Sequence, residues 1–139
     1  MKKIVVLLFL SLFLMPLMAQ NDVRTLTTKE FREKVFNYTT DTVWQYRGSL
    51  PCVIDFYAHW CGPCRRLAPV MEELAEEYCD KVLFYKVNVD EEKELAYLFK
   101  ASSIPLLVFI PVNGQPQIAR GALPKETLIQ AIQDVLLAK

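Results

Sequence analysis

Short apolar runs alternate along this chain with stretches in which apolar residues recur every three or four positions. The runs at 53–58, 81–89 and 106–110 are rich in β-branched and aromatic residues, which is typical of buried strands. A fourth strand is predicted at 117–120, because the Asn-Gly pair at 113–114 is a strong hairpin signal. The first two strands are joined by a long crossover and should therefore run parallel, whereas the hairpin adds an antiparallel strand.

The stretches of helical period predict four helices, at 28–37, 62–79, 90–99 and 124–137. Thr27 and Glu30 have the spacing of a capping box, and Asp90 is expected to cap the third helix. In the last two helices the residues expected to face the core are Leu95, Leu98, Phe99, Leu128, Ile132 and Val135. The order of elements predicts an α/β fold, with a mixed central sheet of four to five strands flanked by helices on both faces.

The first 19 residues have the pattern of a secretory signal peptide. Lys2 and Lys3 precede an apolar run at 4–14, and Ala19 offers a small residue for cleavage. The run is short for a membrane span, so an uncleaved anchor is the less favoured alternative. We therefore expect residues 20–139 to form one domain that is exported to the periplasm or another extracytoplasmic compartment.

Charge and cysteine content narrow the classes of function. Without Lys2 and Lys3 the chain keeps 14 basic and 16 acidic residues, and it has no basic patch that would favour nucleic acid as a partner. Four cysteines in a chain this rich in apolar residues do not suggest a disulfide scaffold, although exported domains can keep disulfides. We therefore expect the cysteines to take part in chemistry rather than to stabilise the fold through disulfides.

Two of these cysteines, Cys61 and Cys64, are separated by two residues where a strand gives way to a helix. A helix N-terminus favours a thiolate, which is the form that attacks disulfides. We expect Cys61 to attack a substrate disulfide and Cys64, one turn into the helix, to resolve the mixed disulfide. Gly62 and Pro63 suit the first turn and fix the geometry of the ring that the two sulfurs close.

Asp55 is the unusual residue of its apolar strand. A carboxylate there is costly without a role or a partner, and burial would raise its pKa. It lies six residues before Cys61, where it could accept the proton of Cys64, directly or through water. Lys86 in the next strand is its candidate partner, and a structural buried acid is the alternative.

These residues resemble the thioredoxin family closely, through Trp60 to Cys64, Asp55, Ile104-Pro105 and the downstream glycines. The resemblance implies the thioredoxin fold and a protein-disulfide reductase that needs no cofactor. It implies catalytic roles for Cys61, Cys64, Asp55 and Lys86, and a cis bond between Ile104 and Pro105. It also implies a substrate-binding surface made of Trp60, Gly62, Pro63, Ile104, Pro105, Gly114, Gly121 and Ala122.

Other features of the sequence leave questions open. His59 is the only histidine, and it replaces the residues that are commoner before this tryptophan. Either it tunes the local charge with pH, or it is an exposed neighbour of the site with little effect. Cys52 and Cys79 lie at the end of the domain remote from Cys61. Strand alternation places Cys52 on the face opposite Asp55, which argues against a Cys52–Cys79 disulfide.

The sequence disfavours several alternative functions. A metal site would want a second close cysteine pair, which the sequence lacks. A non-catalytic binding module is disfavoured by the intact Cys61 and Cys64, and an oxidase or isomerase is disfavoured by the Gly-Pro pair between them. We expect a monomer that reduces disulfide-containing proteins and that draws electrons from a membrane thiol–disulfide donor.

Overall fold

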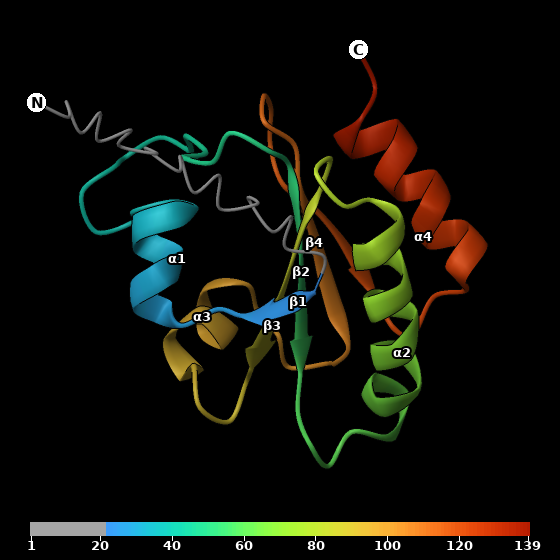
Figure 1. Cartoon of the computed structure of the whole chain (residues 1–139). Helices are drawn as coiled ribbons and strands as arrows, with labels where there is room; N and C mark the ends of the chain where they lie inside the picture. The colour runs from blue at the N-terminus through green and yellow to red at the C-terminus, as the bar shows by residue number, and fades with distance from the viewer. Residues whose placement is uncertain (1–21) are drawn as a thin grey trace, which may run out of the picture.

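The computed structural model describes residues 22–139, and its centre is a five-stranded mixed sheet (Figure 1). The strands lie in the order β1-β3-β2-β4-β5. β2 pairs parallel with β3, as predicted for strands joined by a crossover, and antiparallel with β4. β4 in turn pairs antiparallel with β5, as the hairpin signal predicts. The bounds are β1 Val23–Thr25, β2 Cys52–Tyr57, β3 Leu83–Asn88, β4 Leu106–Ile110 and β5 Gln117–Arg120.

Four helices cover the two faces of the sheet: α1 and α3 lie on one face, and α2 and α4 on the other (Figure 1). Thr27 caps α1, and the predicted capping box with Glu30 is complete. The bounds are α1 Thr28–Lys34, α2 Gly62–Glu77, α3 Lys93–Leu98 and α4 Lys125–Ala131, which continues as the π-helix η1 Ile132–Leu136. The mixed sheet between two helical layers confirms the predicted fold.

Side-chain alternation along β2 divides the core into two clusters. Val53 packs with α2 and α4 on one face, and Cys52, Ile54 and Phe56 pack with α1 and α3 on the other. Asp55 has the parity of Val53 and therefore points toward the α2 face. Cys52 is consequently buried on the face opposite Asp55, as the alternation predicts, and it is a free thiol.

The structure corrects three details of the predicted helices. The third helix begins later than predicted, at Lys93, and Asp90 does not cap it. Leu98 is 41% exposed rather than inward, because the shorter helix ends at this residue. In η1 Leu136 is buried as well, which was not predicted, and Val135, expected to face the core, packs against it only partly buried.

The predicted signal peptide at 1–19 lies outside the described residues. Strand β1, which the sequence analysis missed, is only three residues long and pairs with β3 at the edge of the sheet. None of the helices within residues 22–139 combines the length and the apolar character that a membrane span requires.

Candidate active site

Cys61 and Cys64 form a disulfide at the point where the chain leaves β2 and enters α2. Cys61 is the N-cap residue of this 16-residue helix, and its sulfur accepts a hydrogen bond from the amide of Cys64 at 3.2 Å. Pro63 occupies the first turn, where its missing N–H removes no helical hydrogen bond. The first sulfur therefore lies at the positive end of the helix dipole, which favours a thiolate after reduction.

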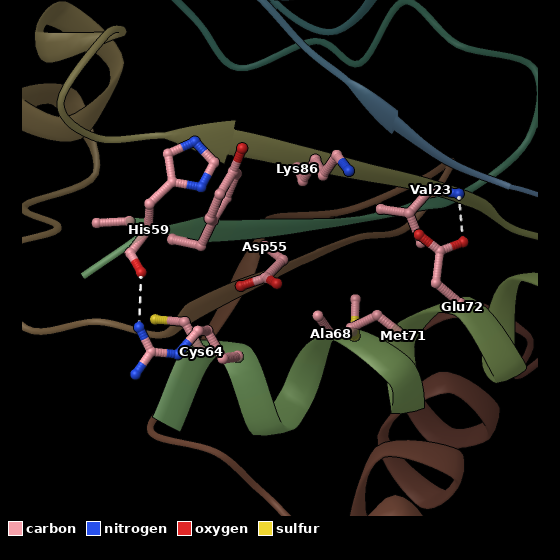
Figure 2. A pocket seen from close by; sticks show the side chains of 11 residues that line it. Val23, Asp55, His59, Cys64, Ala68, Met71, Glu72 and Lys86 are labelled. Atoms are coloured by element: carbon pink, nitrogen blue, oxygen red, sulfur yellow. Dashed lines mark hydrogen bonds between the residues drawn. The ribbon is translucent and has the colours of Figure 1, made fainter. Parts of the chain in front are cut away.

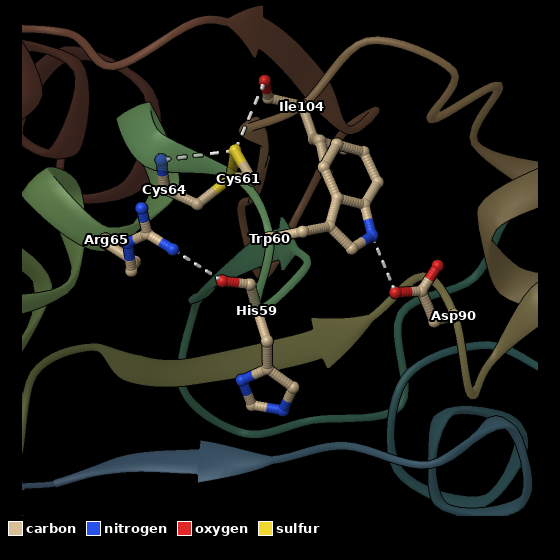
Figure 3. The surroundings of a disulfide bond; sticks show 7 residues. All are labelled: His59, Trp60, Cys61, Cys64, Arg65, Asp90 and Ile104. Atoms are coloured by element: carbon tan, nitrogen blue, oxygen red, sulfur yellow. Dashed lines mark hydrogen bonds between the residues drawn. A yellow bond between two sulfur atoms is a disulfide. The ribbon is translucent and has the colours of Figure 1, made fainter.

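The segment that contains Ile104 lies against this disulfide (Figure 3). The Ile104-Pro105 bond is cis, as expected. The carbonyl oxygen of Ile104 is 3.8 Å from the sulfur of Cys61, which has no proton to donate in the disulfide state. Trp60 beside it is 68% exposed, and its indole N–H donates to Asp90 at 2.8 Å. Asp90, expected to cap a helix, therefore fixes the exposed indole instead.

Asp55 lies behind the disulfide, in a cavity of about 250 Å³ between β2 and α2 (Figure 2). It is only 5% exposed, and its Oδ1 atom has no hydrogen-bond partner in the described part of the chain. Burial raises the pKa of Asp55 to about 7, and the positive charge of Lys86 opposes part of that rise. The carboxyl can therefore gain and lose a proton near neutral pH, beside the cavity that Cys64 also lines.

Lys86 is the register partner of Asp55 on β3 and lines the same cavity. The structure thus brings together Cys61, Cys64, Asp55 and Lys86, the four residues expected to carry the chemistry. The cavity is also lined by Glu72 and Val23, which the sequence analysis did not predict. The carboxylate of Glu72 accepts a hydrogen bond from the amide of Val23, and this bond connects α2 to β1. This bond joins residues 49 positions apart, so no local sequence signal indicates it.

Comparisons with known proteins agree with this geometry. The thioredoxin family model matches residues 22–134. The chain belongs to the thioredoxin family. A thioredoxin of Borreliella burgdorferi is 41% identical over 110 residues, covering 79% of this chain and 94% of that protein. The chloroplastic M-type thioredoxin of Spinacia oleracea is 38% identical over 99 residues, covering 69% of this chain and 55% of that protein.

A solved structure agrees as well. The crystal structure of chloroplastic thioredoxin z superposes with a TM-score of 0.66 at 26% identity, covering 80% of this chain and 91% of that one. The fold, the family and the Cys61–Cys64 disulfide together make this chain a protein-disulfide reductase of the thioredoxin type.

Most residues expected on the substrate-binding surface of this thioredoxin lie around the disulfide. Gly121 follows β5 at the end of the sheet that holds Pro105, and its amide donates to the Pro105 carbonyl at 2.8 Å. Its φ of 91° suits glycine, and a Cβ there would meet nothing within 4 Å, so this surface is open. Ala122 is the next residue along the chain.

Gly114 was expected on the substrate-binding surface, but the structure places it elsewhere. β4 runs antiparallel to β2, so it starts at Leu106 near the disulfide and ends at Ile110 beside Cys52. The connection that follows, drawn in orange at the top of Figure 1, therefore lies at the opposite end of the sheet from Cys61. With φ of 114°, Gly114 shapes this turn and does not contribute to the surface around the disulfide.

The structure also gives the positions of Cys52, Cys79 and His59. Cys52 and Cys79 are both free, and burial raises the pKa of the Cys52 thiol to about 12. His59 lies on the rim of the Asp55 cavity, and its carbonyl accepts from Arg65 at 3.0 Å. Among residues 22–139, no group of three or more histidine, cysteine or acidic side chains is arranged to hold a metal ion.

Proposed function

We propose that this thioredoxin reduces protein disulfides outside the cytoplasm, with Cys61 as nucleophile and Cys64 as resolving thiol. The placement of the Cys61 sulfur supports these roles best. It lies at the N-cap of α2, where an amide hydrogen bond and the helix dipole stabilise negative charge, and beside the exposed indole of Trp60. Cys64 lies one turn further in, on the side of the cavity and Asp55.

The proposed thiol–disulfide exchange has two steps. The Cys61 thiolate attacks one sulfur of the substrate disulfide, forming a mixed disulfide and releasing the other sulfur as a thiolate. The Cys64 thiol passes its proton to the Asp55 carboxylate and attacks Cys61. The Cys61–Cys64 bond forms, the mixed disulfide breaks, and the second substrate sulfur leaves as a thiolate. Lys86 favours the charged form of Asp55 that starts this step.

The surface around the disulfide suits an extended segment of a substrate protein. The residues proposed to form it lie at one end of the sheet. Trp60, Gly62, Pro63, Ile104, Gly121 and Ala122 are exposed or partly exposed, whereas Pro105 is buried and its carbonyl is bonded to the Gly121 amide. Main-chain groups of an extended peptide can pair with the backbone at Ile104, in the way that a peptide adds to a sheet edge. Recognition through the main chain accommodates many sequences, which suits a reductase of varied proteins.

The compartment and the electron source complete the proposal. The sequence at 1–19 has the charged start, apolar run and small residue of a secretory signal. An exported reductase cannot use cytosolic reductant directly, so a membrane thiol–disulfide protein supplies its electrons. The protein works as a monomer, because the exchange needs only the residues of one chain.

Two measurements test this proposal. The redox potential of the Cys61–Cys64 pair, equilibrated with glutathione, should lie near the reducing end of the family range, about −270 mV, and a value near about −120 mV would replace the reductase by an oxidase. With a protein disulfide as substrate, Cys61→Ser should abolish turnover, whereas Cys64→Ser should accumulate the mixed disulfide. Cys79→Ser, outside the site, serves as the control and should keep full turnover.

The location is tested separately. Cell fractionation should recover the protein outside the cytoplasm with a chain that begins near residue 20, whereas a full-length cytoplasmic protein would contradict export. Deletion of the membrane donor should leave the exported protein in its disulfide form.

A further inference from the structure

Helix α3 presents two large apolar side chains to solvent. Leu95 is buried, and Ala96 and Phe99 pack against the core, whereas Tyr97 is 88% exposed and Leu98 is 41% exposed. Exposed apolar residues that are scattered singly over a surface are common and need no explanation. These two, however, are adjacent in sequence and border a hollow of the surface.

This hollow, which we call the α3 groove, has a volume of about 540 Å³. It is formed by the last part of α3 and the segment that follows: Ala96, Tyr97, Leu98, Lys100, Ala101 and Ser102. Most of its lining is apolar, and among these six residues only Lys100 carries a charge. An apolar side chain that enters the groove would therefore leave water for an apolar surface, which is favourable.

The α3 groove adjoins the active-site disulfide along two paths. Ser102 lines the groove and lies two residues before Ile104, whose carbonyl oxygen is 3.8 Å from the first sulfur of the disulfide. On the other side, the guanidinium of Arg120 donates to the Lys100 carbonyl at 3.3 Å, which connects the groove to the residue just before Gly121. Because Ile104 and Gly121 belong to the surface proposed for substrate, the groove is an extension of that surface.

We propose that the α3 groove binds a bulky apolar or aromatic side chain of the substrate protein, a few residues away from the cysteine that Cys61 attacks. This inference rests on the proposed function, in which an extended substrate segment docks beside Ile104. Two residues of chain span at most about 7 Å, and an extended substrate advances about 3.3 Å per residue. The apolar side chain should therefore lie about three to five residues from the substrate cysteine. Tyr97 and Leu98 contact it and determine specificity, without taking part in the exchange of sulfur bonds.

The size of the α3 groove favours a peptide segment over a second copy of this chain. A stable interface between two proteins needs about 20–30 residues on each side. Only six residues line the groove, which is enough to hold one or two side chains of a bound segment. A substrate that is already held at the disulfide also needs little further area, because its remaining freedom is small once it is docked.

The test measures a single turnover, so that no electron donor is needed. The purified protein is reduced, freed of reductant and mixed with increasing concentrations of a disulfide probe, and the products are quantified after acid quenching. The first probe is the symmetric disulfide of a peptide of about 13 residues, with a central cysteine and a leucine four positions away on each side. The second probe has serine in place of both leucines. The third is glutathione disulfide, which is too short to reach the groove.

The informative variant is Tyr97→Ser combined with Leu98→Ser. The concentration of the leucine probe that gives half of the limiting rate should rise about 5- to 20-fold, which corresponds to the loss of part of the burial of one leucine side chain. The limiting rate should change little, because the lost contact is the same before and during the exchange. The serine probe and glutathione disulfide should react alike with the variant and the parent, which also verifies that the variant is folded.

Val112→Ser is the matched control. Val112 is another exposed apolar residue, 39% exposed, and it lies near Gly114 at the opposite end of the sheet from the disulfide. This variant should match the parent with all three probes.

Three results would overturn the inference. One is an equal half-saturating concentration of the leucine probe for the double variant and the parent, and another is a parent that does not distinguish the leucine probe from the serine probe. The third is a parent that sediments as a dimer at the assay concentration while the double variant sediments as a monomer, since a second copy would then occupy the groove. Failure of the proposed function is distinguishable, because the parent would then reduce neither the leucine probe nor glutathione disulfide.

Discussion

Replacing Asp55 by asparagine should stabilise the fold, by an amount that grows with pH. The carboxyl is 5% exposed, and burial raises its pKa from 3.8 to about 7. Between these values the folded protein holds a proton that the unfolded chain has lost, so stability falls as pH rises through this window. A rise of about 3 pKa units corresponds to about 4 kcal/mol, reached just above pH 7 and absent below pH 3.8.

The measurement is urea unfolding of the oxidised protein at pH 4, 5.5, 7 and 8.5, for the parent and for Asp55→Asn. Asparagine keeps the shape and cannot ionise, so any packing cost is constant and only the ionisation cost varies. The difference in unfolding free energy between variant and parent should therefore increase by about 4 kcal/mol from pH 4 to pH 8.5. Glu76→Gln, an exposed acid on the same side of the fold in α2, should show no such trend.

A difference that stays constant with pH would refute the reasoning, because it would mean that the buried carboxyl has an ordinary pKa. A difference that shrinks as pH rises would show the opposite shift, which a direct ion pair with Lys86 would produce.

Three further predictions concern the fold and the free thiols. Thr27→Ala removes the α1 cap and should lower the unfolding free energy by about 1 kcal/mol in urea titrations, whereas Thr27→Ser should restore most of it. Leu136→Ala should cost about 2–4 kcal/mol and Val135→Ala clearly less, and the reverse order would contradict the burial of Leu136 in the core. Thiol titration of the oxidised protein should find one reactive thiol, Cys79, when folded and two after denaturation, when Cys52 becomes accessible; no free thiol after denaturation would indicate a second disulfide.

Local patterns were sufficient to predict the main strands and helices. The apolar runs and the capping box at Thr27 report interactions between residues that are close in sequence, so they survive without tertiary information. The raised pKa of Asp55 was also predictable in direction, since an isolated carboxylate in an apolar strand must be desolvated.

The features that sequence analysis missed depend on contacts between distant segments. The indole of Trp60 competes for Asp90 across 30 residues, so a residue that looks like a helix cap serves another element. The deeper burial of Leu136 than of Val135 depends on packing against the core cluster, which the helical period alone does not specify. The place of Gly114 follows from the direction of β4, which the Asn-Gly pair alone does not reveal.

The hydrogen bond between the Gly121 amide and the Pro105 carbonyl has a consequence for which disulfides are reduced. It holds together the start and the end of the β4–β5 hairpin, and the Trp60–Asp90 bond fixes a separate segment. The docking surface is thus assembled before any substrate arrives, and the enzyme loses little freedom on binding. Under the proposed main-chain recognition, nearly all the ordering cost falls on the substrate, which would present its disulfide in an extended segment. Disulfides in partly unfolded proteins should therefore be reduced faster than disulfides in stable domains. The selectivity then depends on the flexibility of the substrate protein.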